Sequence, residues 1–258
     1  MIRALTLAAL TLLSQLPAQA NTARVLGYVR DADTQRYLYT EVHEQTLAAD
    51  GSVLTGVTTY HDPQGREVAR KTLDYRANRT VPVYRLDIPG QRYAEGISAN
   101  TGPVQLFKQD KGKETREALN PAAGLVAADS GFNHLMLDHL DKLLAGETFR
   151  FTLIAAGNTD QYRFRARKVG TTTLQGEPAV RILVEPDSML RLLVDPIELT
   201  YDQKGTRLMA YRGVSNILNP ATGSVYKNIQ IAYGGKPPAD MEPAGLAQTL
   251  GKVFGVDL

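Results

Sequence analysis

The residues "YLYTEVHEQTLAADGSVLTGVTTYH", 37–61, give the clearest indication of how this chain folds. Two segments of alternating polarity, 37–47 and 53–61, flank the dipeptide Asp50-Gly51. Asp-Gly between such segments is the strongest short-range signal for a β-hairpin. This hairpin signal therefore predicts an antiparallel sheet.

The register of this hairpin follows from its turn. A two-residue loop places Glu41 opposite Tyr60 and His43 opposite Thr58. Side chains alternate between the two faces of a strand, so Tyr39, Glu41 and His43 are expected on one face.

A second turn continues the sheet. "DPQG", residues 62–65, has Asp at the first position, Pro at the second and Gly at the fourth, which is typical of a type I turn. The third strand, "REVARKTLDY" (66–75), then brings Glu67 and Lys71 toward the face that carries Glu41, unless a bulge shifts the register.

One long helix is expected at "DSGFNHLMLDHLDKLLAGE", residues 129–147. Asp129 or Ser130 is placed to cap its start, and Gly146 lies just past its end. Its apolar stripe consists of Phe132, Leu135, Met136, Leu140, Leu143 and Leu144. A stripe of this kind needs a sheet to cover, so Leu140 and Leu143 are expected to face one.

The remaining chain reads as shorter strands separated by Gly, Pro and Asn turns. With the hairpin segments they make roughly ten to twelve antiparallel strands around one main helix, an α+β domain. We expect a single domain over residues 21–233. Residues 234–258 then form a linker, "GGKPPADMEP", and a short amphipathic tail.

The N-terminus has the pattern of a signal peptide. Arg3, the apolar run "ALTLAALTLL" and a small-x-small ending predict cleavage after Ala20 and a mature chain from Asn21. The apolar run is too short for a permanent membrane helix, so no transmembrane segment is expected in the mature chain. A bacterial periplasmic protein is the simplest interpretation, and the absence of cysteine suits that oxidising compartment. A net charge of +2 over 258 residues argues against a nucleic-acid-binding protein.

Four motifs together resemble a known group of proteins. They are "YTEVHE", "YHDPQGREVARKTLDY", "ADSGFNHLMLDHLDKLLAGETFRFTL" and "YDQKGTRLMAYRGVSNI" followed by "NIQIAY". The combination is similar to an uncharacterised family of exported bacterial proteins. The shape of that family is in turn similar to the LolA/LolB-like lipoprotein carriers, half-barrels in which a curved antiparallel sheet wraps helices and holds acyl chains. The resemblance implies such a half-barrel here and transfers no site residues.

"YTEVHE" raises two alternatives. Glu41 beside His43 could act as an acid–base pair, because a carboxylate sets the tautomer of an imidazole and raises its pKa. No nucleophile motif accompanies the pair, so a hydrogen-bonded polar cluster at the mouth of the sheet is favoured. In that cluster Glu41 accepts hydrogen bonds from Tyr60 or Lys71, and His43 lies beside Thr58.

Other residues complete the candidate site. Phe132 and Leu140 are expected to line an apolar cavity, and Ser215 and Asn216, in a bulged closing strand, to lie near it. His134, Asp138 and His139 lack the ligand number and common face of a metal site, so no metal ion and no cofactor is expected.

The favoured function is therefore a noncatalytic periplasmic binding or carrier protein with an apolar cavity. Its ligand would be an apolar small molecule, a lipid or a lipid-linked compound. A periplasmic hydrolase that uses Glu41 and His43 is one alternative, and a structural module that binds an envelope protein is another.

Overall fold

The computed structural model of the protein describes residues 21–188, 195–242, 245, 247–249 and 251. The expected signal peptide, and much of the expected C-terminal tail, lie outside these residues. The elements are β1 (Asn21–Asp31), β2 (Tyr37–Leu47), β3 (Val53–His61), β4 (Glu67–Asp74), β5 (Val83–Ile88), η1 (Pro89–Gln91), β6 (Tyr93–Ala99), β7 (Val104–Asp110), β8 (Lys113–Leu119), β9 (Val126–Ala128), α1 (Gly131–Asp138), α2 (Leu140–Leu144), β10 (Thr148–Ala155), η2 (Ala156–Asn158), β11 (Asp160–Leu174), β12 (Glu177–Pro186), β13 (Ile197–Asp202), β14 (Leu208–Gly213) and β15 (Ile229–Tyr233).

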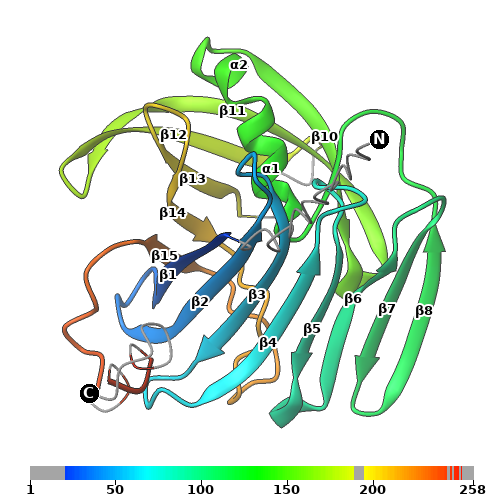
Figure 1. Ribbon diagram of the computed structural model, residues 1–258, viewed down its shortest axis with the longest axis horizontal. Coiled ribbons are helices and arrows are strands. Elements are labelled where there is room, and N and C mark those ends of the chain that lie inside the picture. The colour runs from blue at the N-terminus through cyan, green and yellow to red at the C-terminus, as the bar shows by residue number, and fades with distance from the viewer. Residues whose placement is uncertain (1–20, 189–194, 243–244, 246, 250, 252–258) are drawn as a thin grey trace, which may run out of the picture.

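All of the described strands belong to one curved, open sheet (Figure 1). Its order is β8-β7-β6-β5-β4-β3-β2-β1-β15-β14-β13-β12-β11-β10-β9, so β8 and β9 are the two edges. Neighbours pair antiparallel except β9 and β10, which run parallel. The expected curved antiparallel sheet is thus confirmed, but the expected ten to twelve strands are corrected to 15.

The first hairpin has the register that its sequence predicts. Glu41 pairs with Tyr60 and His43 with Thr58. The connection is longer than the expected two residues, because the register shifts between Thr46 and Leu47 and the ladder ends there. Residues 48–52 then make the turn.

The second turn also forms as predicted, but a bulge follows it. The amide of Gly65 donates to the carbonyl of Asp62 at 2.8 Å. The register of β3 against β4 shifts beside Tyr60, so Lys71 faces the concave side opposite Thr58 while Glu67 is exposed. The expectation that Glu67 and Lys71 share a face is therefore wrong, since an extra residue in a strand reverses every side chain beyond it.

The single helix expected over 129–147 is two short helices. α1 ends at Asp138, and His139, with φ −123° and ψ 13°, breaks the helix before α2 begins. Leu135, Met136, Leu140 and Leu143 are buried. They form a helix-side core with Phe151, Ala166, Val180, Ile182, Val184, Leu199 and Tyr201 on β10–β13. The apolar stripe thus covers the sheet although the helix itself is broken.

The helices in the described ranges are all short. None of them is long and apolar enough to cross a membrane.

The sheet curls until its ends approach each other. The one-turn helix η2, which follows β10, packs against β6 and β7. A Cβ on Gly157 would lie 2.1 Å from Oε2 of Glu95, so the glycine lets η2 approach this carboxylate without displacing it. Segments from the two halves of the sheet therefore meet at η2.

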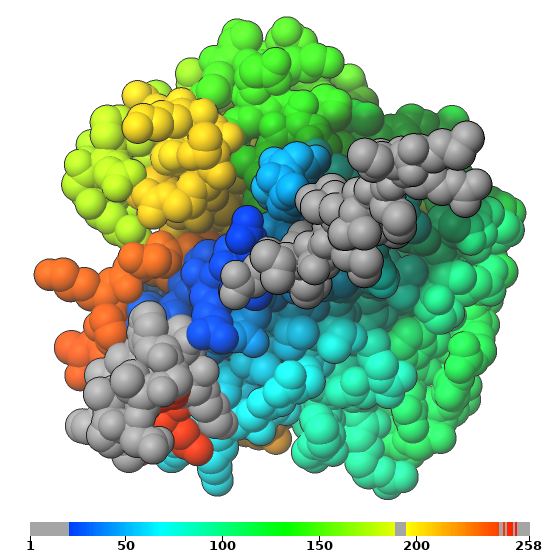
Figure 2. Space-filling model, viewed as in Figure 1, coloured from blue at the N-terminus to red at the C-terminus, as the bar shows by residue number. Residues whose placement is uncertain are grey.

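The C-terminal segment packs through Met241 on the outer side of β1 and β2, and Figure 2 shows its red residues beside the cyan part of the chain. Asp240 accepts hydrogen bonds from Arg30 Nη2 at 2.7 Å and from the Tyr37 amide at 2.9 Å. Met241 packs with Tyr28 and Tyr37. These contacts explain why the outward residues of β2 are buried as well as the inward ones.

Candidate functional site

Alternation along β2 places three polar side chains on the concave face. Tyr39 and Glu41 are buried, and the side chain of His43 is 25% exposed. The exposure of these three side chains therefore rises toward the C-terminal end of the strand, so the imidazole lies between a buried carboxylate and the solvent.

His43 forms hydrogen bonds with two neighbouring side chains. Its Nε2 lies 2.9 Å from Oε2 of Glu41, and its Nδ1 lies 3.1 Å from the hydroxyl of Thr58. A neutral imidazole that donates from Nε2 and accepts at Nδ1 satisfies both bonds. Among the described residues, Oε1 of Glu41 receives no hydrogen bond. A carboxylate oxygen that receives no donor from the protein keeps its acceptor capacity, so Oε1 is the part of the site that a ligand could complete.

A wall of tyrosines surrounds Glu41. The negative charge of Glu41 adds to the effect of burial in raising the pKa of each of Tyr39, Tyr60, Tyr211 and Tyr233. All four phenols thus stay neutral and donate or accept hydrogen bonds as hydroxyls. The rings supply a large apolar surface with polar tips.

Ser215 and Asn216 reach this wall from a loop. The hydroxyls of Tyr39 and Ser215 are 2.7 Å apart, and Nδ2 of Asn216 donates to the hydroxyl of Tyr60 at 3.0 Å. β14 ends at Gly213, so the expected bulged closing strand is instead a loop that folds back into the concave side.

The rim of the site lies on β1 and β15. Gly27 pairs with both Glu41 and Tyr233, and a Cβ there would lie 2.9 Å from the Tyr233 ring. The missing side chain leaves room for that ring, whose centroid is 5.8 Å from that of His43. Val25 pairs with His43 on the same face and is 42% exposed. An apolar, accessible edge thus borders the imidazole.

Lys71 faces the same interior but has a different partner from the expected Glu41. Its Nζ lies 2.7 Å from Oδ1 of Asp129, and both side chains are less than a tenth exposed. Burial alone would raise the pKa of Asp129, but the Lys71 ammonium and the Ser130 hydrogen bonds lower it. Asp129, at φ +43°, is thus a buried counterion rather than the helix cap that its position suggests.

A second buried carboxyl, Glu95, was not expected. It lies on β6 opposite Leu86 and accepts hydrogen bonds from the hydroxyls of Tyr84 and Tyr93. Burial raises its pKa, and the charge of Asp129 adds to that effect. The alternation Tyr93, Glu95, Ile97 in "YAEGI" is the same signal as in "YTEVHE" and could have identified it.

Glu95 predicts a pH dependence of stability. Its folded-state pKa lies above the ordinary 4.5, so its contribution is complete below that value and is lost as the pH rises through the folded-state pKa. Glu95→Gln keeps a neutral side chain, so unfolding free energies measured from about pH 4 to about pH 8 should show the parent losing stability relative to the variant. Parallel curves would contradict a raised pKa.

Two other residues expected at the cavity belong to the helix-side core. Phe132 stacks on Phe151 with ring centroids 5.7 Å apart, and Leu140 is 2% exposed. Neither contributes to the polar cluster around Glu41.

The histidines of the helices are held by other groups. His134 packs edge-on against Tyr75 at 4.9 Å, and burial lowers its pKa. Asp138 pairs with Arg79 at 3.0 Å, and Nδ1 of His139 lies 3.2 Å from the carbonyl of Leu135. Among the described residues, no cluster of three potential ligands could hold a metal ion.

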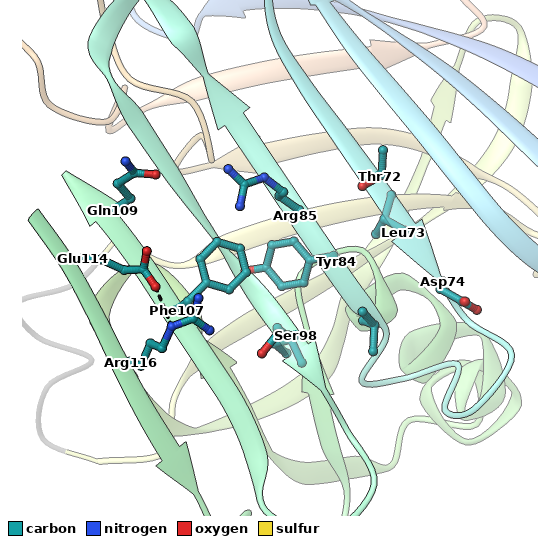
Figure 3. Close-up of a pocket in the computed structure, with 12 residues that line it drawn as sticks. Thr72, Leu73, Asp74, Tyr84, Arg85, Ser98, Phe107, Gln109, Glu114 and Arg116 are labelled. Atoms are coloured by element: carbon teal, nitrogen blue, oxygen red, sulfur yellow. Dashed lines mark ion pairs between the residues drawn. The ribbon is translucent and has the colours of Figure 1, made fainter. Parts of the chain in front are cut away.

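A groove of about 380 Å³ lies on the outer side of β4–β8 (Figure 3). The Arg85 guanidinium is 5.3 Å from the centre of the Phe107 ring and bonds to Asp87. Arg116 pairs with Glu114 at 2.5 Å. Because these charged groups already have partners, the concave cluster around Glu41 is the better candidate site.

The hydrogen bonds of His43 predict the effect of removing it. His43→Ala leaves the Glu41 carboxylate and the Thr58 hydroxyl without a partner, so it should lower the free energy of unfolding by about 1–3 kcal/mol. Gln45→Ala, on the same face of β2, is a control that should change it by less than about 0.5 kcal/mol. Denaturant unfolding measures both. If the free energies of unfolding of His43→Ala and Glu41→Gln match or exceed that of the parent, the structural interpretation of the cluster fails. Stability that is unchanged or improved is typical of replacing a functional residue.

Comparison with known proteins finds similarity in structure alone. No protein-family model matches the chain, and no curated protein matches it significantly. The crystal structure of a beta-barrel-like protein of the domain of unknown function DUF1849, from Brucella abortus, is similar with 12% identity, a TM-score of 0.46, and coverage of 83% of this chain and 95% of that one.

Two further crystal structures show a weaker similarity. A putative outer membrane lipoprotein-sorting protein domain from Vibrio parahaemolyticus has 9% identity, a TM-score of 0.24, and coverage of 89% of both chains. A DUF1329 family protein from Desulfovibrio piger has 10% identity, a TM-score of 0.24, and coverage of 87% of this chain and 90% of that one. Two of these three similar structures come from domains of unknown function and one from a lipoprotein-sorting domain, the two kinds of protein that the sequence motifs resemble.

Proposed function

We propose that the protein is a noncatalytic binding or carrier protein whose ligand enters the concave side of the sheet beside His43. The observation that carries this proposal is the gradient along β2, from the buried carboxylate of Glu41 to the part-exposed imidazole of His43 and its exposed neighbour Val25. Such a gradient suits a ligand with an apolar body and one polar group. Protein sites for such ligands are concave, mostly apolar and provided with a few placed polar groups.

The chemistry of the lining supports an apolar or amphiphilic ligand, including a lipid. Tyr211 and Tyr233 are only partly buried and present ring surface beside the cluster. The imidazole of His43 and Oε1 of Glu41 are the polar groups that would meet the ligand's polar end.

The direct test is organic extraction of the purified protein followed by mass spectrometry. Co-purified lipid or another amphiphile is the expected result. A second test uses a dansyl-labelled fatty acid and the variant Val25→Glu, which puts a charge at the rim and should weaken binding about tenfold, a loss of about 1.4 kcal/mol.

The matched control is Val225→Glu. Val225 is 39% exposed, close to the 42% of Val25, but lies in the loop between β14 and β15. Equal binding by the two variants, or an extract free of any amphiphile together with no probe binding, would contradict the proposal.

A hydrolase remains the second candidate, because Thr58, His43 and Glu41 form a continuous hydroxyl–imidazole–carboxylate chain. This is the order of groups in a nucleophile, base and orienting acid. Thr58 is only 2% exposed, however, which separates its hydroxyl from a substrate and favours binding over catalysis. Ester hydrolysis by the purified protein that is lost in both Thr58→Val and His43→Ala would reverse this preference.

Export to the periplasm is part of the same proposal. Cleavage after Ala20 should leave a chain that starts at Asn21, the first residue of β1. N-terminal sequencing of the periplasmic fraction tests this, and a chain that retains Met1 in the membrane fraction would contradict it.

A further inference from the structure

The outer side of β10–β14 carries a cluster of arginines. The register places Arg150 opposite Arg165, Arg165 opposite Glu185, and Glu198 opposite Arg212. The arginines that share this outward face are Arg150, Arg163, Arg165, Arg167, Arg181 and Arg212, and we call them the arginine face. All six cations are guanidinium groups.

The acids of the arginine face are fewer and more covered than its cations. Glu185 serves both Arg165, at 2.6 Å, and Arg167, at 3.4 Å. Arg150 pairs with Asp187 at 2.9 Å and Arg181 with Glu198 at 3.6 Å. The side chains of Glu185, Asp187 and Glu198 are 14%, 22% and 34% exposed, whereas those of Arg150, Arg167 and Arg181 are 67%, 41% and 43% exposed.

Two arginines have no acid partner within the described ranges. Arg163 and Arg212 are both exposed, and Arg212 makes its side-chain hydrogen bond with the amide oxygen of Asn228 at 3.3 Å. Six cations against three carboxylates leave an excess of three positive charges on this face. Farther along the same strands Glu177 pairs with Arg207, and Asp202 holds the turn after β13, so the excess is concentrated at the arginine face.

The other half of the sheet has no such excess of positive charge among its arginines. On the outer side of β4–β8 each arginine has its own acid. The pairs are Arg70 with Glu67, Arg76 with Asp74, Arg85 with Asp87, and Arg116 with Glu114. That side is electrically balanced, so the uneven distribution is a property of one face rather than of the whole chain.

From this contrast we propose that the arginine face docks the protein on an anionic phospholipid surface. Guanidinium groups match the geometry of phosphate, and all of the cations here are of that type. The arginines lie on four strands, β10, β11, β12 and β14, instead of converging on one point, as suits an extended anionic surface better than a single ligand. Each basic side chain near an anionic bilayer adds a modest attraction that falls off within a Debye length.

The test is co-sedimentation of the chain from Asn21 onward with vesicles. One set of vesicles contains phosphatidylglycerol mixed with phosphatidylcholine, and the other contains phosphatidylcholine alone. We expect binding only to the anionic vesicles, and its loss at high salt. The double variant Arg163→Gln with Arg212→Gln should bind about tenfold more weakly, because each residue contributes on its own and neither has an acid partner to leave behind.

The matched control is Arg70→Gln with Arg116→Gln, which removes the same net charge from the balanced half. Its binding should stay within about twofold of the parent, and thermal unfolding shows that both double variants fold. Equal weakening of the two double variants would mean that net charge alone attracts the protein, which overturns the proposal. Failure to bind anionic vesicles would also overturn the proposal. Binding of polyglutamate instead of the vesicles would overturn it in favour of an acidic protein partner.

Discussion

Lys71→Met is expected to lower the free energy of unfolding by about 3–5 kcal/mol, because it leaves the buried carboxylate of Asp129 without its counterion. The Lys71 and Asp129 side chains are 4% and 7% exposed, so water cannot take over the role of the ammonium. Denaturant unfolding at neutral pH measures this loss.

The same pair predicts how the loss changes with pH. The pKa of Asp129 in the folded protein is below the ordinary 3.8, so the stabilisation by the pair is present above that value and is lost as the pH falls through the folded-state pKa. In Lys71→Met, protonation relieves the unpaired carboxylate, so the difference from the parent should shrink at acid pH.

The double variant Lys71→Met with Asp129→Asn provides the control. It removes both charges and should recover much of the stability, because a matched neutral pair avoids the uncompensated charge. A double variant that is as unstable as the sum of the two single variants would show that the pair contributes by packing instead of by charge.

Leu143→Ala is expected to cost about 2–5 kcal/mol, because it opens a cavity in the helix-side core. Leu143 is fully buried there, in contact with a cluster that extends over β10–β13. Urea unfolding checks the loss, and Lys142→Ala, at the exposed neighbouring position of α2, should change stability by less than about 0.5 kcal/mol. A similarly small loss for Leu143→Ala would mean that the helices do not cover the sheet.

The first hairpin was predictable because its determinants are close in sequence. Asp50-Gly51 and the alternation on either side fix the pairing of Glu41 with Tyr60 and of His43 with Thr58. The bulge that carries Glu67 outward was not predictable in position, since it depends on how β4 must bend to follow the curl of the sheet.

The number of strands was underestimated because three strands lack an apolar alternation. β1 begins at the very start of the described chain, β8 is an edge strand exposed on nearly all its residues, and β9 has three residues in a parallel pair. Their backbone hydrogen bonds to neighbouring strands hold them in place, and such bonds leave no pattern in side-chain polarity.

In the candidate site, too, some features follow from the local sequence and others depend on distant parts of the chain. Glu41 and His43 are two residues apart on one strand, so alternation alone was enough to place them on one face. Glu95 carries the same alternating signal. Its burial, by contrast, depends on η2 lying across it, and η2 belongs to the other end of the sheet.

The features that could be predicted from the amino-acid sequence are local: the sheet class, the first hairpin and its register, the apolar stripe that covers the sheet, and the polar face of β2. The pairing of residues that lie far apart in the chain follows from the closing of the sheet. Lys71 pairs with Asp129, 58 positions away, and Tyr39 bonds to Ser215, 176 positions away. The physical reason is that a turn or an alternation depends on a few neighbouring residues, whereas the partner of a buried charge is whichever group the closing sheet brings within reach.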